Sequence, residues 1–396
     1  MGANRSTQPT NFVSRETNTG AVYLDAAATS PVDPRIAELV LHVMVEEFGN
    51  AGSRTHSYGA DALRRVNQAR EQVAAAVGST PDEVVFTSGA TEADNLAILG
   101  LEAHAAETGR RHIVATAIEH KAVLEPVAHL QAKGFEATLV APDRSGRVDP
   151  DEVLSAVRSD TLLVSVMHGN NETGAIQPIE TVAEGLTDER VLLHVDAAQT
   201  FGRETQALRE RRIDLISLSG HKIFAPKGVG ALVVRRRGGR RAPLSPLMFG
   251  GGQERGLRPG TLPTPLIAGF GLAAELAARE ENDRRIRCLT IRSEALAALE
   301  RLDPIVHASG GPVLPHILSF AVPGVDSEAL MVAAKDLVAI SNGSACTSAS
   351  YAPSHVLTAM GLAEEVVQGT VRLSWSHLTP AIPWQSFAER VEDLRL

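Results

Sequence analysis

The feature that most constrains this chain is a regular alternation between short apolar runs and longer amphipathic stretches. Near-continuous apolar runs are typical of strands buried on both faces, as in parallel sheets covered by helices. Parallel strands need crossover connections, and the amphipathic stretches suit crossover helices. We therefore expect an α/β fold with a mostly parallel seven-stranded sheet flanked by helices, plus a smaller α+β domain. The runs are EVVFT (83–87), HIVATA (112–117), ATLVA (137–141), TLLVSVM (161–167), VLLHVD (191–196), DLISLS (214–219) and GALVVR (230–235).

The pattern of the chain changes near residue 270, where a long helical region leads into shorter strands and helices. A chain of 396 residues exceeds the usual length of one domain, so two domains are expected. The N-terminal segment has no apolar core region, so we interpret it as a mobile leader and not as a secretory signal. The expected divisions are a leader over 1–20, a large cofactor-binding domain over 33–270, and a small domain that takes in 21–32 and 271–396.

The composition narrows the class of protein further. Asp and Glu number 47 against 38 Lys and Arg, which gives a net charge of −9 and argues against direct nucleic-acid binding. No apolar segment is long enough to predict a membrane span. The two cysteines, Cys288 and Cys346, form no disulfide framework, so we expect a cytoplasmic protein with reduced thiols. The five arginines of RRRGGRRAPLSP (235–246) predict an exposed insertion, either solvated or docking an acidic protein or a nucleic acid.

Three polar clusters directly follow apolar runs, at the ends of parallel strands where ligands bind. TSGATEADN (87–95) opens a helix whose first N–H groups suit a phosphate, although a plain capped helix would look similar. HVDAAQ (194–199) places Asp196 where a carboxylate can cap a helix or hold a protonated ring nitrogen. SLSGHK (217–222) ends in Lys222, a candidate for Schiff-base chemistry or a surface charge. Together the three clusters match the needs of pyridoxal 5'-phosphate.

Cys346 lies in SNGSACTSAS (341–350), where every neighbour is small, polar or both. Such a segment makes few buried contacts and opens at low free-energy cost. We therefore expect a mobile loop that carries its thiol to a cofactor and then to an external acceptor. The loop contains no Lys, Arg or His that could lower the thiol pKa, so activation must come from elsewhere in the site. Cys288 lies in a charged helical stretch and is expected to be an ordinary helix residue.

A longer series of motifs points to one family. In chain order they are YLDAAAT, FGN, SGATEADNLAI, EHKAVL, HGNNETGAIQPI, HVDAAQ, SGHKIFAPKGVGAL, GGGQERGLRPGTLP and GSACTSAS, and they cover residues 22–375. With these motifs the chain resembles the cysteine desulfurases of the class V aminotransferase family, which are pyridoxal-phosphate enzymes of fold type I. The resemblance is strongest to the group of iron–sulfur and nitrogen-fixation desulfurases. It implies that L-cysteine becomes L-alanine and that a persulfide forms on Cys346.

The same resemblance implies catalytic and ring-binding roles. Lys222 would form the Schiff base with the cofactor and, once released, move the α-proton of the substrate. His120 would stack on the ring and serve as acid and base, and Cys346 would attack the substrate sulfur as a thiolate. Asp196 would pair with the ring nitrogen, and Gln199 would reach the ring hydroxyl.

Further residues would hold the phosphate and the substrate. Thr261 is expected to complete the phosphate site from the other subunit, which implies a homodimer. Asn171 would contact the cofactor and, with the planar fork of Arg372, hold the substrate carboxylate. No metal site is expected. The phosphate would be held within one subunit by Ala90, Thr91, Ser219 and His221.

The acceptor of the sulfur is open at this point. FGNAGSRTHSYG, LMFGGGQERGLRPGTLPTPLI and PHILSF are similar to desulfurases of bacterial DNA phosphorothioation systems. The chain stops at AERVEDLRL, without the tail that helps iron–sulfur desulfurases dock their scaffold protein. Iron–sulfur assembly and tRNA thiolation remain alternatives for the pathway. A selenocysteine lyase, a class V transaminase or a cofactor-free scaffold remain alternatives for the activity. Trp375 would either pack beneath the small domain or narrow the substrate pocket.

Overall fold

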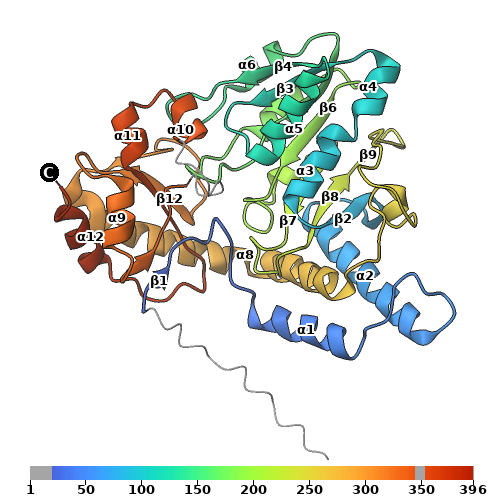
Figure 1. Cartoon of the computed structure of the whole chain (residues 1–396), viewed down its shortest axis with the longest axis horizontal. Helices are drawn as coiled ribbons and strands as arrows, with labels where there is room; N and C mark the ends of the chain where they lie inside the picture. The colour runs from blue at the N-terminus through green and yellow to red at the C-terminus, as the bar shows by residue number, and fades with distance from the viewer. Residues whose placement is uncertain (1–19, 344–352, 396) are drawn as a thin grey trace, which may run out of the picture.

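The computed structural model describes residues 20–343 and 353–395 (Figure 1). The strands of its large sheet are β2 (Val84–Thr87), β3 (His112–Thr116), β4 (Glu136–Val140), β5 (Thr161–Ser165), β6 (Leu192–Asp196), β7 (Leu215–Ser219) and β8 (Gly230–Val234). They lie in the order β2-β8-β7-β6-β5-β3-β4. Only β8 pairs in antiparallel fashion with its neighbours. This arrangement confirms the expected mostly parallel seven-stranded sheet.

Helices cover both faces of this sheet, because successive side chains of each strand point to opposite sides. Val85 of β2 packs in the core on the face covered by α3, α4 and α5, whereas Phe86 packs on the opposite face with α2, α6, α7 and α8. Both faces are therefore dry, which explains the near-continuous apolar runs. The helices are α2 (Ser57–Ala76), α3 (Ala90–Leu99), α4 (Glu102–Thr108), α5 (Lys121–Ala132), α6 (Pro150–Ser155), α7 (Ile179–Gly185) and α8 (Thr264–Leu299).

A smaller antiparallel sheet in the order β11-β12-β14 forms the second part of the molecule. Its core includes Leu24 as well as Phe320 and Leu373, so residues from the chain start pack with the C-terminal part. Its strands are β11 (Ile305–Val306), β12 (Ile317–Ala321) and β14 (Thr370–Ser374). The other elements here are β1 (Val22–Tyr23), β13 (Val338–Ala339), α9 (Ser327–Ala333), α10 (His355–Ala359), α11 (Glu364–Gly369) and α12 (Trp384–Glu392).

The long helix α8 connects the two parts, as Figure 1 shows. Its first half packs against α1 (Pro34–Val45) and α2, and its second half belongs to the core of the small sheet. The proposed domain boundary at residue 270 falls inside this continuous helix. Short 3-10 turns lie at Pro81–Glu83, Ala207–Arg209, Glu254–Gly256 and Glu300–Leu302. No helix within the described ranges is both long and apolar enough to cross a bilayer.

The arginine-rich segment 235–246 is only partly the exposed insertion that its composition predicts. A small hairpin of β9 (Arg236–Arg237) and β10 (Arg240–Arg241) does project from the sheet. Arg235, however, is only 2% exposed. Its guanidinium donates to four backbone carbonyls, including those of Val77 at 2.7 Å and Leu208 at 2.6 Å. Backbone acceptors from distant segments therefore satisfy this buried cation, which composition alone could not indicate.

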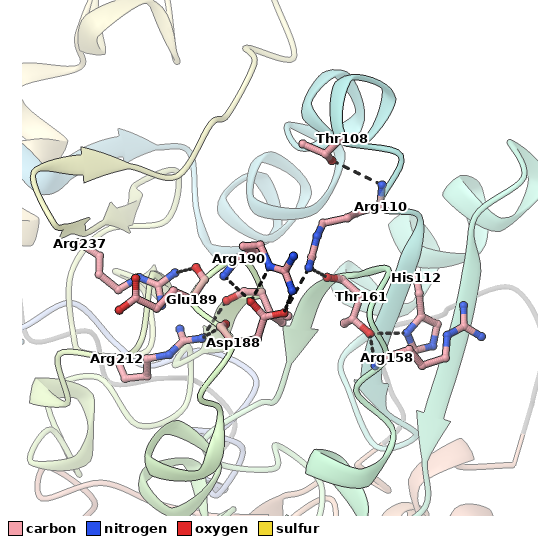
Figure 2. A network of polar contacts seen from close by, with 11 residues as sticks. Thr108, Arg110, His112, Arg158, Thr161, Asp188, Glu189, Arg190, Arg212 and Arg237 are labelled. Carbon is pink, nitrogen blue, oxygen red and sulfur yellow. Dashed lines mark hydrogen bonds and ion pairs between the residues drawn. The ribbon is translucent and has the colours of Figure 1, made fainter.

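Charged groups at the starting edge of the sheet hold neighbouring strands together, as Figure 2 shows. Asp188, just before β6, accepts hydrogen bonds from Arg110 at 3.2 Å and Arg190 at 2.9 Å. Thr161, the first residue of β5, bonds the ring of His112, the first residue of β3, at 2.8 Å. Arg190, the largest influence, and Arg110 hold the pKa of the Asp188 carboxyl below its usual range. The charged groups at this edge thus stabilise the fold. A ligand site is expected at the other edge, where the parallel strands end.

Candidate active site

A cavity of about 370 Å³, here called the inner cavity, lies at the carboxyl ends of the parallel strands. The segment after β2, the ends of β6 and β7, and the loops after β3 and β5 all contribute to its wall. The structure thus brings together most of the residues that the sequence predicts for the site. Those that line it are Ala90, Thr91, His120, Asn171, Asp196, Gln199, Ser219, His221 and Lys222.

One end of the inner cavity suits a phosphate group. Helix α3 begins at Ala90, and its N-cap residue Gly89 provides no side-chain cap. The first N–H groups of a helix lack intrahelical partners and carry partial positive charge, so they attract an anion. Ser219 and His221, which follow from the end of β7, line the same space, and His221 Nδ1 lies 3.1 Å from Thr29 Oγ1. These donors fit the phosphate of pyridoxal phosphate.

The other end presents polar atoms that fit the pyridine ring. Asp196 is buried at the end of β6, and its Oδ1 accepts the backbone N–H of Ala198 at 2.8 Å. Gln199 donates through Nε2 to the Ala27 carbonyl at 2.9 Å, while its buried Oε1 has no hydrogen-bond partner among the described residues. A buried carboxylate beside an unpartnered amide oxygen matches a protonated ring nitrogen and a ring hydroxyl. The residues present therefore fit the cofactor.

Burial sets the electrostatics of Asp196. Desolvation, helped by the nearby Asp94 carboxyl, raises the pKa of Asp196 to about 6. Asp94 is itself buried on α3, and burial raises its pKa to about 7. The carboxylates of Asp94 and Asp196 therefore repel each other when both are ionised, and a protonated ring nitrogen beside Asp196 would offset this repulsion.

His120 stands between the inner cavity and the space outside it. It caps α5, and its Nδ1 accepts the backbone N–H of Ala122 at 3.1 Å. In a neutral ring the proton must then lie on Nε2. Burial lowers the pKa of His120, an effect that the charge of Asp196 offsets only in part. A neutral ring with a fixed orientation is suited to stacking and to proton transfer through Nε2.

A second cavity of about 550 Å³, here called the outer cavity, adjoins the first. The two share Thr91, His120 and Asn171 in their walls. Gly343 and Pro353 also line the outer cavity. Cys346 itself lies outside the described residues, but the residues on both sides of 344–352 border this cavity.

Arg372 and Thr261 lie outside the lining of both cavities. Arg372 is buried on β14, where Nη1 donates to the Asn171 carbonyl at 2.7 Å and Nη2 to Asp25 Oδ1, also at 2.7 Å. Its Nε makes no hydrogen bond within the described ranges. The contact with Asn171 places the guanidinium behind the cavity wall. Thr261 is exposed and does not line the cavity of its own chain. Substrate binding by Arg372 and the contribution of Thr261 to a second subunit both stay predictions.

Several charged residues near the cofactor space were not predicted as site residues. Glu92, Asp94 and Lys227 line the inner cavity. Glu119, just before His120, accepts hydrogen bonds from Thr116 Oγ1 and from the Met167 backbone, both at 2.7 Å. Burial raises the pKa of Glu119 well above its usual value. The motifs TEADN and EHK contain Asp94 and Glu119, but only the packing of α3 and the β3 loop onto the sheet places them beside Asp196.

Trp375 and Cys288 belong to the structural core. Trp375 is fully buried, packs in the small-sheet core and donates its indole N–H to the Cys288 carbonyl at 3.0 Å. It therefore packs beneath the small domain and does not line the inner or the outer cavity. Burial raises the pKa of the Cys288 thiol to about 11, so this sulfur is a poor nucleophile at neutral pH.

Comparisons with known proteins agree with this geometry. Residues 22–381 match the aminotransferase class-V family. Cysteine desulfurase IscS from Vibrio cholerae serotype O1 is 45% identical over 361 residues, which cover 90% of this chain and 88% of that protein. The crystal structure of DndA from Streptomyces lividans is 52% identical with a TM-score of 0.79, and the match covers 89% of this chain and 99% of that one. A NifS-like protein is 35% identical with a TM-score of 0.86, covering 94% and 99%.

The fold and the inner cavity thus define a pyridoxal-phosphate enzyme of fold type I, and the chain belongs to the class-V aminotransferase family. Within that family it is a pyridoxal-phosphate-dependent cysteine desulfurase, as its relatives of 44–45% identity are. Cysteine desulfurases act on L-cysteine and pass its sulfur to an acceptor protein. These relatives favour a desulfurase over a selenocysteine lyase, a class V transaminase or a cofactor-free scaffold.

Proposed function

We propose that this cysteine desulfurase forms its persulfide on Cys346 and supplies that sulfur to the proteins of DNA phosphorothioation. One observation carries the assignment of the nucleophile. Gly343 and Pro353 border the outer cavity together with His120, so both ends of the nine-residue segment 344–352 start at the entrance to the cofactor space. Cys346 comes three residues after Gly343, so at about 3.3–3.6 Å per extended residue it can lie up to about 10 Å from the cavity border.

Each of these residues of the inner cavity has its own role in the proposed reaction. When bound, pyridoxal phosphate supplies an electron sink for the charge that develops on the α-carbon of L-cysteine. Asp196 keeps the proton on the ring nitrogen, and Gln199 accepts the ring hydroxyl through Oε1. Lys222 carries the cofactor and then moves the α-proton, and His120 serves as a second acid and base through Nε2. The N-terminus of α3, with Ser219 and His221, fixes the phosphate.

The sulfur transfer balances without a further reactant. The Cys346 thiolate attacks the substrate sulfur, so an S–S bond forms and the substrate C–S bond breaks. The electron pair of that bond stays with the β-carbon, which gains a proton as L-alanine forms; Lys222 and His120 would hold and move the protons, and the bound cofactor would supply the electron sink. The products are L-alanine and a persulfide on Cys346, and the sum of atoms equals one L-cysteine and one thiol.

The homodimer is a further part of the proposal. Large apolar side chains on and after α1 are exposed, including Met44 at 58% and Phe48 at 66%, and Phe249 is 90% exposed. Large apolar side chains that are this exposed are typical of interaction sites. Phe249 and Thr261 belong to one loop before α8, so a second copy seated on this loop would bring Thr261 toward its phosphate site. Light scattering of the purified protein tests this, and a monomer at micromolar concentration would contradict it.

The phosphorothioation pathway rests on likeness to one relative in particular. The segments FGNAGSRTHSYG and LMFGGGQERGLRPGTLPTPLI resemble desulfurases of those systems. Identity to DndA of Streptomyces lividans is 52%, against 45% to IscS of Vibrio cholerae. The acceptor is therefore proposed to be a protein of the DNA-modifying complex. Supply of sulfur for iron–sulfur clusters is the second candidate, and the likeness to IscS over 90% of the chain favours it.

A sulfur-transfer experiment tests both parts. The enzyme is loaded with radiolabelled L-cysteine and mixed with a phosphorothioation acceptor, an iron–sulfur scaffold protein or a tRNA-thiolation relay protein. We expect label on the phosphorothioation acceptor, no label from Cys346→Ser, and unchanged labelling from the matched variant Cys288→Ser. Exclusive labelling of the scaffold would overturn the pathway alone, and full alanine production by Cys346→Ser would overturn the nucleophile.

A further inference from the structure

The loop over residues 250–263, here called the 250–263 loop, leads into α8 and carries the exposed Thr261. A single 3-10 turn, Glu254–Gly256, lies in its middle. Three successive residues of that turn have positive φ, from 48° at Glu254 to 84° at Gly256. Residues other than glycine rarely adopt this conformation, and they keep it only where the surrounding structure fixes them. Contacts with the rest of the molecule therefore hold the 250–263 loop in a defined shape.

A buried ion pair fixes this turn to the large sheet. Glu254 Oε1 accepts a hydrogen bond from Arg70 Nη2 at 2.6 Å, and Oε2 accepts one from Arg70 Nη1 at 2.9 Å. Oε2 also accepts the backbone N–H of Phe86 at 2.7 Å, on the strand β2 that forms one edge of the sheet. Glu254 is only 6% exposed and Arg70 9%. Because removing one partner would leave the other charge buried and unpaired, this anchor is costly to break.

One further hydrogen bond connects the anchor to Thr261. The backbone N–H of Gly260, directly before Thr261, donates to Gln253 Oε1 at 2.8 Å. This bond closes residues 253–260 into one compact turn that has Glu254 near its start and Thr261 at its end. A shift of Glu254 would therefore displace Thr261 as well.

We propose that Glu254, held by Arg70, is a positioning residue for the cofactor site of the other subunit. It fixes the 250–263 loop so that Thr261 of one copy reaches the phosphate site of the second copy. The inference rests on the proposed homodimer and on the predicted role of Thr261. Neither Glu254 nor Arg70 lines the inner or the outer cavity, so an effect of Glu254 on cofactor binding has to pass through the loop.

The structure also offers a route within one subunit, which an experiment has to separate from the proposed one. Arg258, in the same loop, donates through Nε to Glu92 Oε1 at 3.0 Å. Glu92 lies in the first turn of α3 and lines the inner cavity of its own chain. A displaced loop could therefore disturb the phosphate site of the same subunit, and only an assay that distinguishes the two subunits decides between the routes.

The variant Glu254→Gln keeps the size of the side chain but removes its charge. We expect the dissociation constant of pyridoxal phosphate to rise at least about threefold, and no further than in Thr261→Ala, which removes the contact outright. The double variant should bind the cofactor as Thr261→Ala does, because both changes act through one contact. Asp214→Asn is the matched control and should leave the affinity unchanged. Asp214 is also buried and accepts the Leu193 N–H and Arg212 Nη1, both at 2.8 Å, but it lies at the starting edge of the sheet.

Hybrid dimers, co-expressed with two affinity tags, show in which subunit Glu254 acts. One subunit of each hybrid carries Lys222→Ala, so borohydride reduction at graded cofactor concentrations fixes the cofactor only to the remaining Lys222 of the other subunit. With Glu254→Gln on the Lys222→Ala subunit, we expect weakened binding at that remaining lysine. With Glu254→Gln on the subunit that retains Lys222, we expect the affinity of a hybrid without the Glu254 change.

Each outcome bears on a stated part of the proposal. The reverse pattern, or equal weakening in both hybrids, would overturn it, as would unchanged affinity of Glu254→Gln beside weakened binding by Thr261→Ala. Unchanged affinity of Thr261→Ala, or a monomeric enzyme, would instead overturn the homodimeric site and this inference with it. Arg70→Lys keeps the buried charge but loses the planar fork, and it gives the same hybrid test should Glu254→Gln fail to fold.

Discussion

Replacing Asp196 by Asn tests the ring-binding end of the inner cavity. The substitution keeps the shape of the side chain and a carbonyl oxygen that can accept the Ala198 N–H, but it removes the charge. Asn can also place its NH₂ group toward the ring nitrogen, where a donor cannot stabilise the protonated form. The predicted loss is therefore that of one charge-assisted contact in a buried site.

The size of the effect follows from the burial of Asp196. A hydrogen bond to a charged group is worth about 1.5–3 kcal/mol, and burial places Asp196 at the upper part of that range. Since about 1.4 kcal/mol corresponds to a factor of ten, we expect the dissociation constant of pyridoxal phosphate to rise ~30- to 150-fold. Catalysis should fall as well, because the unprotonated ring is a weaker electron sink.

The assay is a titration of cofactor-free protein with pyridoxal phosphate, followed by the absorbance of the bound cofactor at a pH of about 8, well above the pKa of Asp196. Asp188→Asn is a matched control, since Asp188 also accepts arginine hydrogen bonds but lies at the starting edge of the sheet (Figure 2). Its cofactor affinity should equal that of the unmodified enzyme. A change of less than about threefold in Asp196→Asn would refute the assigned role.

The pH dependence of cofactor affinity tests the same contact, because its direction follows from the pKa of Asp196. The pKa of Asp196 is raised from 3.8 to about 6, so the carboxyl is ionised above that pH and protonated below it. Only the ionised form holds a protonated ring nitrogen, so cofactor affinity should fall as the pH drops through about 6, and Asp196→Asn should flatten that fall. In the cofactor-free protein, the free energy of unfolding changes with pH in the opposite direction. The stability linked to Asp196 is fully present below 3.8 and is lost as the pH rises through about 6.

Three further substitutions have defined outcomes. Gln199→Leu should weaken cofactor binding about tenfold in the same titration, because Oε1 has no hydrogen-bond partner among the residues that the structure describes. Unchanged affinity would show that this oxygen does not face the ring hydroxyl. Arg372→Lys should raise the KM for L-cysteine at least ~10-fold in an alanine assay, whereas an unchanged KM would place the carboxylate elsewhere. Trp375→Phe should lower the free energy of unfolding by about 1–3 kcal/mol in urea, since the buried indole loses its hydrogen bond to the Cys288 carbonyl and the smaller ring leaves a cavity. Trp384→Phe is its control, because that indole donates to an exposed Glu294, and a change above about 0.5 kcal/mol there would contradict the argument.

Much of the large sheet could be predicted from the sequence, because its strands are buried on both faces. Each of the seven apolar runs became a strand, and the polar cluster after a run came to lie at the carboxyl edge. Thr91, Asp196 and Lys222 are far apart in the chain, but parallel strands bring their ends to one side. Topology of this kind needs only the local pattern of each segment.

Other features depend on contacts that no local pattern records. From the sequence, Arg235 is expected to lie in an exposed basic loop. In the structure its guanidinium is buried and donates hydrogen bonds to the backbone carbonyls of residues 77, 208, 210 and 213. Asp94 and Glu119 lie in motifs that gave no sign of a role for either residue, and only packing onto the sheet brings them near Asp196. The pairing of Arg203 with His316 crosses 113 residues and joins two sheets.

The central claim is that the sulfur of L-cysteine passes through Cys346. Mass spectrometry of peptides from the enzyme after one turnover with L-cysteine, without an acceptor, tests it most directly. We predict that the Cys346 peptide gains the mass of one sulfur atom, that L-alanine appears in equal amount, and that the Cys288 peptide is unchanged. Alanine released while Cys346 remains an unmodified thiol, or sulfur found on Cys288 instead, would contradict this account.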